Sequence, residues 1–147
     1  MWSTSNPLSP STPNSDFLRS HARRVLRHAR AAQAHVALPV LRRLVAAKLN
    51  AGQSLSALHA SRETLQLKTL LRLLAVELGY ADWAACKAVI DSREAACLDR
   101  YRLDAGAFGD FEKNWFANAT QARDWQRQHG GYVVQYGEQA VAILRPA

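Results

Sequence analysis

The stretch 61–90 constrains the fold more than any other part of the chain, because it is the most apolar run and carries clear helix signals. At 100° per residue, one apolar face of a helix consists of Leu67, Leu70, Leu71, Leu74 and Leu78. A second apolar face consists of Leu65, Leu73 and Val76. A surface helix needs only one apolar face, so a helix with two is expected to lie between other elements. The pattern predicts a core helix over 63–78, with Ser61 as its N-cap.

The predicted core helix ends in a tight corner. Gly79 suits the left-handed residue that follows a helix, and Asp82 can cap a second helix over 83–90. Such a corner could be a DNA-binding helix-turn-helix or a purely structural turn. The second helix offers the single cation Lys87 and begins with an acid, whereas base readout needs Arg, Asn or Gln, so the structural turn is favoured.

The hexapeptide LGYADW at positions 78–83 resembles the LGY-x-DW corner of the small helical module found beside glyoxalase-related domains in bacterial proteins. The resemblance covers the central third of the chain and implies a helical module. Ala84 stands where a polar residue is usual in that module. Glyoxalase chemistry needs His and Glu metal ligands on a β-rich domain, and no such domain fits in this chain.

Length and composition predict a soluble, cytoplasmic protein without a cofactor. The chain of 147 residues fits one domain with an appended subdomain, and no apolar run is long enough for a bilayer. Cys86 and Cys97 are too few for a disulfide framework and lack metal-ligand spacing. His21, His28 and His35 recur every seven residues, roughly 10 Å apart along a helix, so they cannot share a metal ion. No catalytic motif is present, although an active site built from dispersed residues stays open.

The expected fold class is α+β, in three parts: a disordered tail over 1–15, a helical module of four to five helices over 16–104, and a small subdomain over 105–147. The first helix, over 16–36, carries an alanine-rich seam that should either pack on its own domain or be mobile. Its N-cap is Ser15 or Asp16, and Pro39 is expected to begin the second helix, which closes near 50–52.

The last third of the chain changes from helical to strand periodicity. A Gly-Glu turn at 137–138 predicts a hairpin that pairs Tyr132 with Ile143 and Val134 with Val141. A strand near 115–116 and a helix over 119–129, capped by Asn118, complete a β-α-β-β unit that ends in this hairpin. Its core is expected to consist of aromatic residues (Trp115, Phe116, Trp125, Tyr132 and Tyr136), and the two tyrosines could alternatively stack nucleobases.

Charge is the most informative feature for function. Residues 1–50 hold eight Lys or Arg and one acid, whereas each of the other two thirds is balanced, so the net charge of +7 lies in the first third. A segregated basic block points to an anionic partner. The leading hypothesis is a small non-enzymatic protein that contacts nucleic-acid phosphates through Arg19, Arg23, Arg24, Arg27, Arg30, Arg42, Arg43 and Lys48, extended by Lys68 and Arg72. The alternative is an adaptor or inhibitor that docks on an acidic protein surface. DNA or RNA preference and oligomeric state stay open.

Overall fold

The computed structural model describes residues 1–147, and the chain forms two compact units. The helical unit comprises Thr12–Arg93, and the sheet unit combines Met1–Ser11 with Glu94–Ala147. With seven α-helices and one three-stranded antiparallel sheet, the chain has the predicted α+β class. The division lies after Arg93 and not at the expected position, 104–105, because the short helices after Arg93 contact each other and the sheet.

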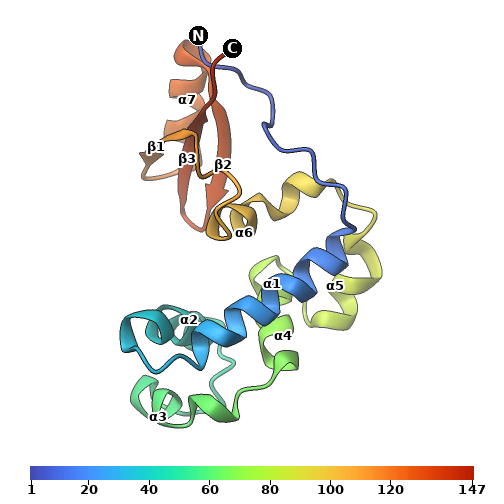
Figure 1. Cartoon of the computed structure of the whole chain (residues 1–147), viewed down its shortest axis with the longest axis vertical. Coiled ribbons are helices and arrows are strands. Elements are labelled where there is room, and N and C mark those ends of the chain that lie inside the picture. The colour runs from blue at the N-terminus through green and yellow to red at the C-terminus, as the bar shows by residue number, and fades with distance from the viewer. The chain divides into compact units, whose positions relative to one another are not determined.

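The helical unit is built around two helices, α1 and α4, which pack against each other (Figure 1). Their buried hydrophobic residues are leucines, valine and alanines, and the alanines let the two backbones approach closely. Its elements are α1 (Asn14–Ala29), α2 (Ala34–Ala46), α3 (Leu55–Ala60), the 3₁₀ turn η1 (Arg62–Thr64), α4 (Leu67–Glu77) and α5 (Trp83–Ile90). Ala22 and Ala29 are fully buried, so the alanine seam packs inside its own unit.

The boundary between the first two helices differs from the prediction. The first helix ends at Ala29 and not at 36, and Pro39 lies inside α2 instead of beginning it. The guanidinium of Arg62 donates a hydrogen bond of 2.9 Å to the carbonyl oxygen of Ala31, just beyond the end of α1. The early break also lets Leu41 and Leu44 of α2 bury completely. These gains offset the helical hydrogen bond that Pro39 removes.

The start of α1 is capped from the other end of the unit. Neither Ser15 nor Asp16 is the N-cap; the helix begins at Asn14, after Pro13. The carboxylate of Asp91, just after α5, accepts hydrogen bonds from the backbone N–H (2.7 Å) and hydroxyl (2.8 Å) of Ser15. These two hydrogen bonds lower the pKa of Asp91. The carboxylate of Asp91, although distant in sequence, therefore caps the start of α1.

The predicted corner after α4 is confirmed. Gly79 has φ +94° and follows the helix, and the side chain of Asp82 accepts the N–H of Ala85 at 2.8 Å to cap α5. The start of α4 is where the prediction was wrong. The helix begins at Leu67, because Ser61 ends α3 and the following residues form η1 and an extended link.

The sheet unit contains η2 (Ala95–Leu98), α6 (Asp99–Asp104), β1 (Glu112–Phe116), α7 (Ala119–His129), β2 (Tyr132–Tyr136) and β3 (Gln139–Leu144). The strand order is β1-β3-β2, with both pairs antiparallel. The hairpin has the predicted register, with Tyr132 opposite Ile143 and Val134 opposite Val141. Asn118 caps α7 as predicted, by accepting the N–H of Gln121 at 2.9 Å.

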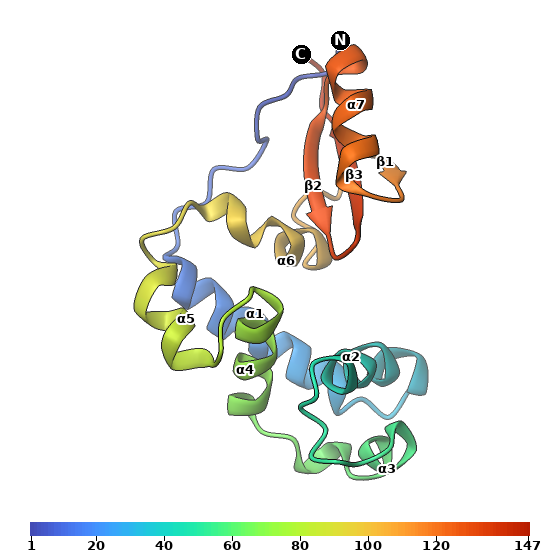
Figure 2. The same ribbon diagram turned by 180° about the vertical axis from the view of Figure 1, so that it is seen from behind.

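The central strand β3 is buried on both faces, and α7 lies along the sheet (Figure 2). Val141 and Ile143 join Val134 and Phe108 in the hydrophobic core of this unit. The predicted aromatic core is therefore wrong in composition, and Trp115 is 46% exposed. The small residues of β3 leave room for α7, while β-branched residues fill the opposite face.

The N-terminal segment is held on the sheet unit and does not form the expected disordered tail. Trp2 pairs with Gly130 in a parallel bridge, and its N–H donates to the carbonyl oxygen of His129 at 2.8 Å. Ser3 donates its N–H to the carbonyl oxygen of Arg145 at 3.0 Å. Backbone groups after α7 and after β3 supply these partners, which composition alone does not reveal.

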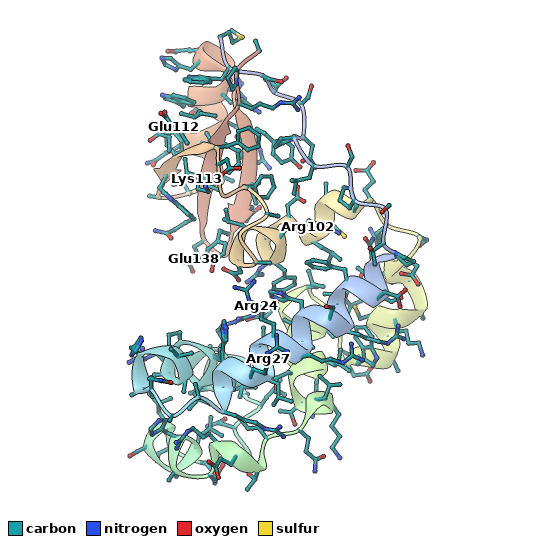
Figure 3. All side chains as sticks on the ribbon, viewed as in Figure 1. Arg24, Arg27, Arg102, Glu112, Lys113 and Glu138 are labelled. Atoms are coloured by element: carbon teal, nitrogen blue, oxygen red, sulfur yellow. The ribbon has the colours of Figure 1, made fainter.

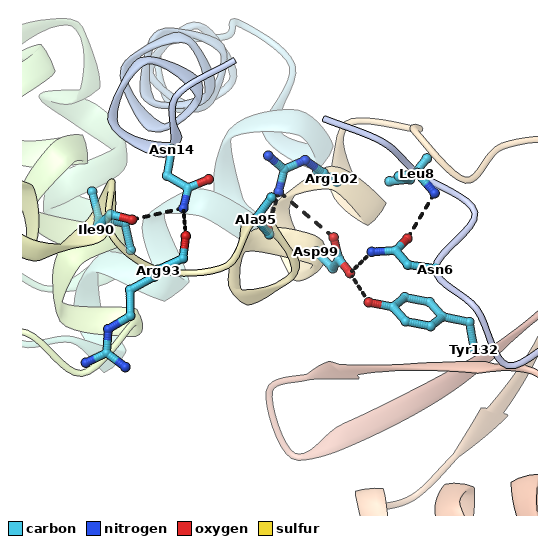
Figure 4. A network of polar contacts seen from close by, with 9 residues as sticks. All are labelled: Asn6, Leu8, Asn14, Ile90, Arg93, Ala95, Asp99, Arg102 and Tyr132. Atoms are coloured by element: carbon cyan, nitrogen blue, oxygen red, sulfur yellow. Dashed lines mark hydrogen bonds and ion pairs between the residues drawn. The ribbon is translucent and has the colours of Figure 1, made fainter. Parts of the chain in front are cut away.

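A buried polar network fixes the same segment further along (Figure 4). The carboxylate of Asp99 accepts hydrogen bonds from the hydroxyl of Tyr132 and from the side-chain amide of Asn6. Arg102 lies 3.9 Å from that carboxylate and donates to the carbonyl oxygen of Ala95. Burial raises the pKa of Asp99, and these partners oppose the rise. Burial and the bond to Asp99 likewise raise the pKa of Tyr132. The Tyr132 hydroxyl thus has a structural role as a hydrogen-bond donor to Asp99.

None of the helices combines the length and the apolar character needed to cross a membrane.

Gly130→Ala should release the first three residues from the sheet unit. A Cβ at Gly130 would lie 1.9 Å from the carbonyl oxygen of Trp2, and φ there is +80°. We expect faster hydrogen exchange at Trp2 and Ser3 and a loss of about 1–3 kcal/mol in unfolding free energy. Gly137→Ala is the matched control, because φ is +61° and nothing lies within 4 Å of its Cβ. Equal exchange at Trp2 in both variants would contradict the docking of this segment.

Candidate nucleic-acid interface

The two units differ sharply in charge. The helical unit holds thirteen Lys or Arg and five Asp or Glu, which gives +8. The sheet unit holds six Lys or Arg and seven Asp or Glu, which gives −1. All ten cations predicted to contact phosphate lie in the helical unit. A positive charge concentrated on one unit attracts anions to that unit.

An exposed stripe of arginines runs along α1. Arg23, Arg27 and Arg30 are spaced by four and three residues, so they share one face of the helix, opposite the buried Ala22 and Ala29. Figure 3 shows Arg24 and Arg27 projecting from α1. Arg30 also donates to the carbonyl oxygen of Leu65 but stays exposed. We call Arg23, Arg27 and Arg30 the α1 stripe.

Two of the predicted contacts are already engaged inside the unit. Arg43 on α2 donates two hydrogen bonds, of 2.9 and 2.6 Å, to the carboxylate of Glu77 on α4. This forked pair is partly buried and links the two helices. Arg19 pairs with Asp16 at 3.1 Å, and its guanidinium carbon lies 5.7 Å from the ring centroid of Trp83. Arg19 and Arg43 therefore have less to offer a phosphate than the α1 stripe.

Three further predicted cations meet at a pocket of about 520 Å³. Lys48 lies just after α2, whereas Lys68 and Arg72 are one turn apart on α4. All three side chains are exposed and form no ion pair within the helical unit, and the same holds for Arg42 on α2. The pocket is lined by Lys48, Leu49, Ala51, Lys68, Thr69, Arg72, Asp82, Trp83 and Ala84. We call Lys48, Lys68 and Arg72 the pocket cations.

Trp83 is the pocket residue that sequence reasoning missed. The helical spacing of Trp83, Val89 and Ile90 predicts that these residues pack back on the leucines of the core helix. In the structure it is half-buried at the start of α5, beside Asp82, and forms part of the pocket wall. No local pattern shows that this ring faces the same cavity as cations from α4 and from the loop after α2. The juxtaposition depends on how three helices pack.

Lys48 holds an unfavourable backbone conformation. Its N–H bonds to the carbonyl oxygen of Val45 at 3.0 Å and the next N–H, of Leu49, to that of Leu44 at 2.9 Å, which is the Schellman pattern. The left-handed residue of this motif is usually glycine, and Gly79 fills the same position after α4. Lys48 fills it after α2 with φ +60°, and Ala51 in the same loop has φ +50°. Left-handed backbone at a side-chain-bearing residue often marks a functional site.

The cations of the helical unit also affect a buried histidine, His21. His21 on α1 is 5% exposed and stacks on Phe17, with ring centroids 5.7 Å apart. Burial lowers the pKa of His21 from 6.5 to about 4, and the cations Arg43 and Arg24 contribute to the decrease, while Glu77 opposes it. The imidazole is therefore neutral at pH 7.

No group of three or more His, Cys, Asp or Glu side chains is arranged to hold a metal ion. Comparisons with protein-family models, with curated proteins and with solved structures find no match to this chain. Its function is therefore inferred from the charges, the pocket and the backbone described above.

Lys48→Gly should stabilise the helical unit, because glycine adopts the left-handed conformation without the steric cost that a Cβ carries. We expect a gain of about 1 kcal/mol in unfolding free energy, measured by urea denaturation. Gly79→Lys is the mirror-image control: φ is +94° and nothing lies within 4 Å of its Cβ, so a loss of similar size is expected. Destabilisation by Lys48→Gly would mean that the lysine side chain supports the fold.

Acid should destabilise the helical unit through His21. The unfolded chain takes up the proton near pH 6.5 and the folded chain only near pH 4. The stabilisation is complete above pH 6.5 and is lost as pH falls through this window, by up to about 3 kcal/mol. Urea denaturation at pH 7 and pH 5 measures the loss, which His21→Gln should reduce. His35→Gln is the control, because His35 lies exposed near the start of α2. An unchanged pH dependence in His21→Gln would contradict this assignment.

Proposed function

We propose that the protein is a small, basic, non-enzymatic binding protein whose helical unit contacts nucleic-acid phosphates. The α1 stripe, Arg24, Arg42 and the pocket cations make these contacts, with Arg19 in a lesser role. Recognition is driven by the phosphate backbone and tolerates sequence.

The observation that carries the proposal is the uncompensated charge of the helical unit, +8, with exposed cations on α1, α2, α4 and the loop after α2. Exposed cations are ordinary when acids lie among them, because the charges then screen one another. Here thirteen cations face five acids. Such an imbalance costs stability through self-repulsion and favours binding of a polyanion, which releases counterions when it binds.

The phosphate contacts are assigned to the helical unit and not to the β-α-β-β unit that we propose for the C-terminal region. The sheet unit has a charge of −1, the ring of Tyr132 stacks on Phe108, and the ring of Tyr136 packs edge-on against Trp115. These two rings are therefore poor candidates for base stacking.

The test is the dependence of affinity on salt, measured by fluorescence anisotropy with a labelled single-stranded oligonucleotide. Replacing the α1 stripe (Arg23→Gln, Arg27→Gln and Arg30→Gln together) should make the negative slope of log K against log[salt] shallower, by roughly 0.7 for each phosphate that the variant no longer neutralises. Affinity at low salt should fall with it, and different sequences should bind alike.

The matched control replaces three exposed arginines of the sheet unit by glutamine, namely Arg123, Arg127 and Arg145, for the same change in net charge. Equal weakening by both triple variants would show that only net charge matters and would contradict the assigned surface. No binding at low salt, together with a defined protein complex that survives nuclease treatment, would favour the alternative, docking on an acidic protein surface.

A further inference from the structure

We infer that the pocket beside Trp83 holds one unpaired nucleotide, with the base against the indole ring and the phosphate among Lys48, Lys68 and Arg72. This inference rests on the proposed function and extends it, because it names the part of the nucleic acid that is recognised and predicts a preference for single strands over duplex.

The lining of the pocket has the polarity that a nucleotide requires. The pocket cations come from the loop after α2 and from α4, whereas Trp83 and Asp82 come from the start of α5. Three cations from two elements suit a phosphate. An indole in the wall suits a base, since every base has a π-face and stacking tolerates sequence.

Asp82 fits the base end of such a ligand. One of its carboxylate oxygens accepts the N–H of Ala85, and the other oxygen is available to accept a base amino group or a ribose hydroxyl. A carboxylate would repel a second phosphate at that position, so the phosphate is confined to the side of the cations. The pocket therefore orients a nucleotide as well as attracting it.

The volume of the pocket and the contact of Arg19 with the indole of Trp83 also support a nucleotide as the ligand. A volume of about 520 Å³ is within the range of small-molecule sites. The guanidinium of Arg19 lies 5.7 Å from the ring centroid of Trp83, and Arg19 is itself held by Asp16. This contact steadies the indole in the pocket wall. A base in a duplex is stacked on its neighbours and cannot reach the ring, whereas an unpaired base can.

The backbone at Lys48 supports a ligand site independently. The chain places a lysine where glycine would be more stable, and the side chain from this strained position lines the pocket. A gain in binding accounts for a residue held at a cost to stability. Lys48→Gly is therefore expected to weaken binding although it stabilises the fold, and Lys48→Arg is expected to retain binding.

The experiment uses the intrinsic fluorescence of Trp83, which is the one tryptophan of the helical unit; Trp2, Trp115 and Trp125 belong to the sheet unit. The full chain is titrated with an oligothymidylate of about eight nucleotides, a site size within the range for single-strand binders. Parallel titrations use a duplex, adenosine monophosphate and inorganic polyphosphate. The signal of the pocket is the quenching that Trp83→Phe removes.

We expect quenching by the single strand, quenching by adenosine monophosphate at higher concentration, and none by the duplex or by polyphosphate, which has no base. Lys68→Gln and Arg72→Gln should each weaken the single-strand titration roughly tenfold. Lys87→Gln is the control, because Lys87 is exposed on α5 and is not part of the pocket lining. Trp83→Leu, followed by anisotropy, measures the loss of stacking without relying on fluorescence.

The outcomes separate this inference from the proposed function. Salt-dependent strand binding without quenching of Trp83, and with unchanged affinity in the pocket variants, overturns the inference and leaves the proposed function standing. Quenching by adenosine monophosphate that depends on Lys68 and Arg72, without strand binding, supports the pocket with a free nucleotide as ligand and overturns the proposed function. Quenching by polyphosphate equal to that by the single strand overturns the role of the base.

Discussion

The helical unit has too few acids for its cations, and the fold itself occupies most of those acids. Asp16 and Glu77 pair with arginines of the same unit, while Asp82 and Asp91 accept backbone N–H groups at the starts of α5 and α1. Of the five acids, Glu63 alone is outside these contacts. The α1 stripe and the pocket cations form no ion pair within the unit, although the carboxylate of Asp82 lines the same pocket as Lys48, Lys68 and Arg72. The proposed attraction of this unit for an anionic partner rests on this deficit.

Two features of the helical unit carry a cost in stability. His21 is kept neutral in the core beside two arginines, and Lys48 holds a left-handed backbone at the edge of the pocket. At position 48 glycine would adopt the same backbone conformation without the steric cost. A ligand that binds only the folded state offsets such costs by mass action. The same repulsion that weakens the free unit therefore strengthens the attraction of an anion.

Sequence predicted well those features that depend on neighbours in the chain. Gly79 ends α4, Asp82 and Asn118 cap their helices, and a two-residue turn sets the register of the hairpin. In each case the hydrogen-bonding partners lie within a few residues. The ends of α1 depend instead on Asp91 and Arg62, which composition near α1 cannot reveal. The prediction for the N-terminal segment was wrong for the same reason, because its partners are backbone groups at the far end of the chain.

The candidate site likewise has a part that the sequence predicted and a part that depends on residues distant in the chain. Net charge identified the cationic residues, but not which of them the fold neutralises. Arg43 is matched by Glu77 across two helices, while Lys68, with similar local surroundings in sequence, is exposed at a pocket. Spacing predicted Trp83 as a packing residue only, since nothing in its neighbourhood shows the cations that share its cavity. Prediction of the site required the tertiary arrangement of α2, α4 and α5.

Chemical-shift mapping of the 147-residue chain with a single-stranded oligonucleotide at low salt tests the phosphate-binding role of the helical unit most directly. We predict shifts concentrated between residues 19 and 84, largest near Lys48, Lys68 and the indole N–H of Trp83, and fading as salt is added. Shifts confined to residues 94–147, or no shifts at any salt concentration, would contradict this role.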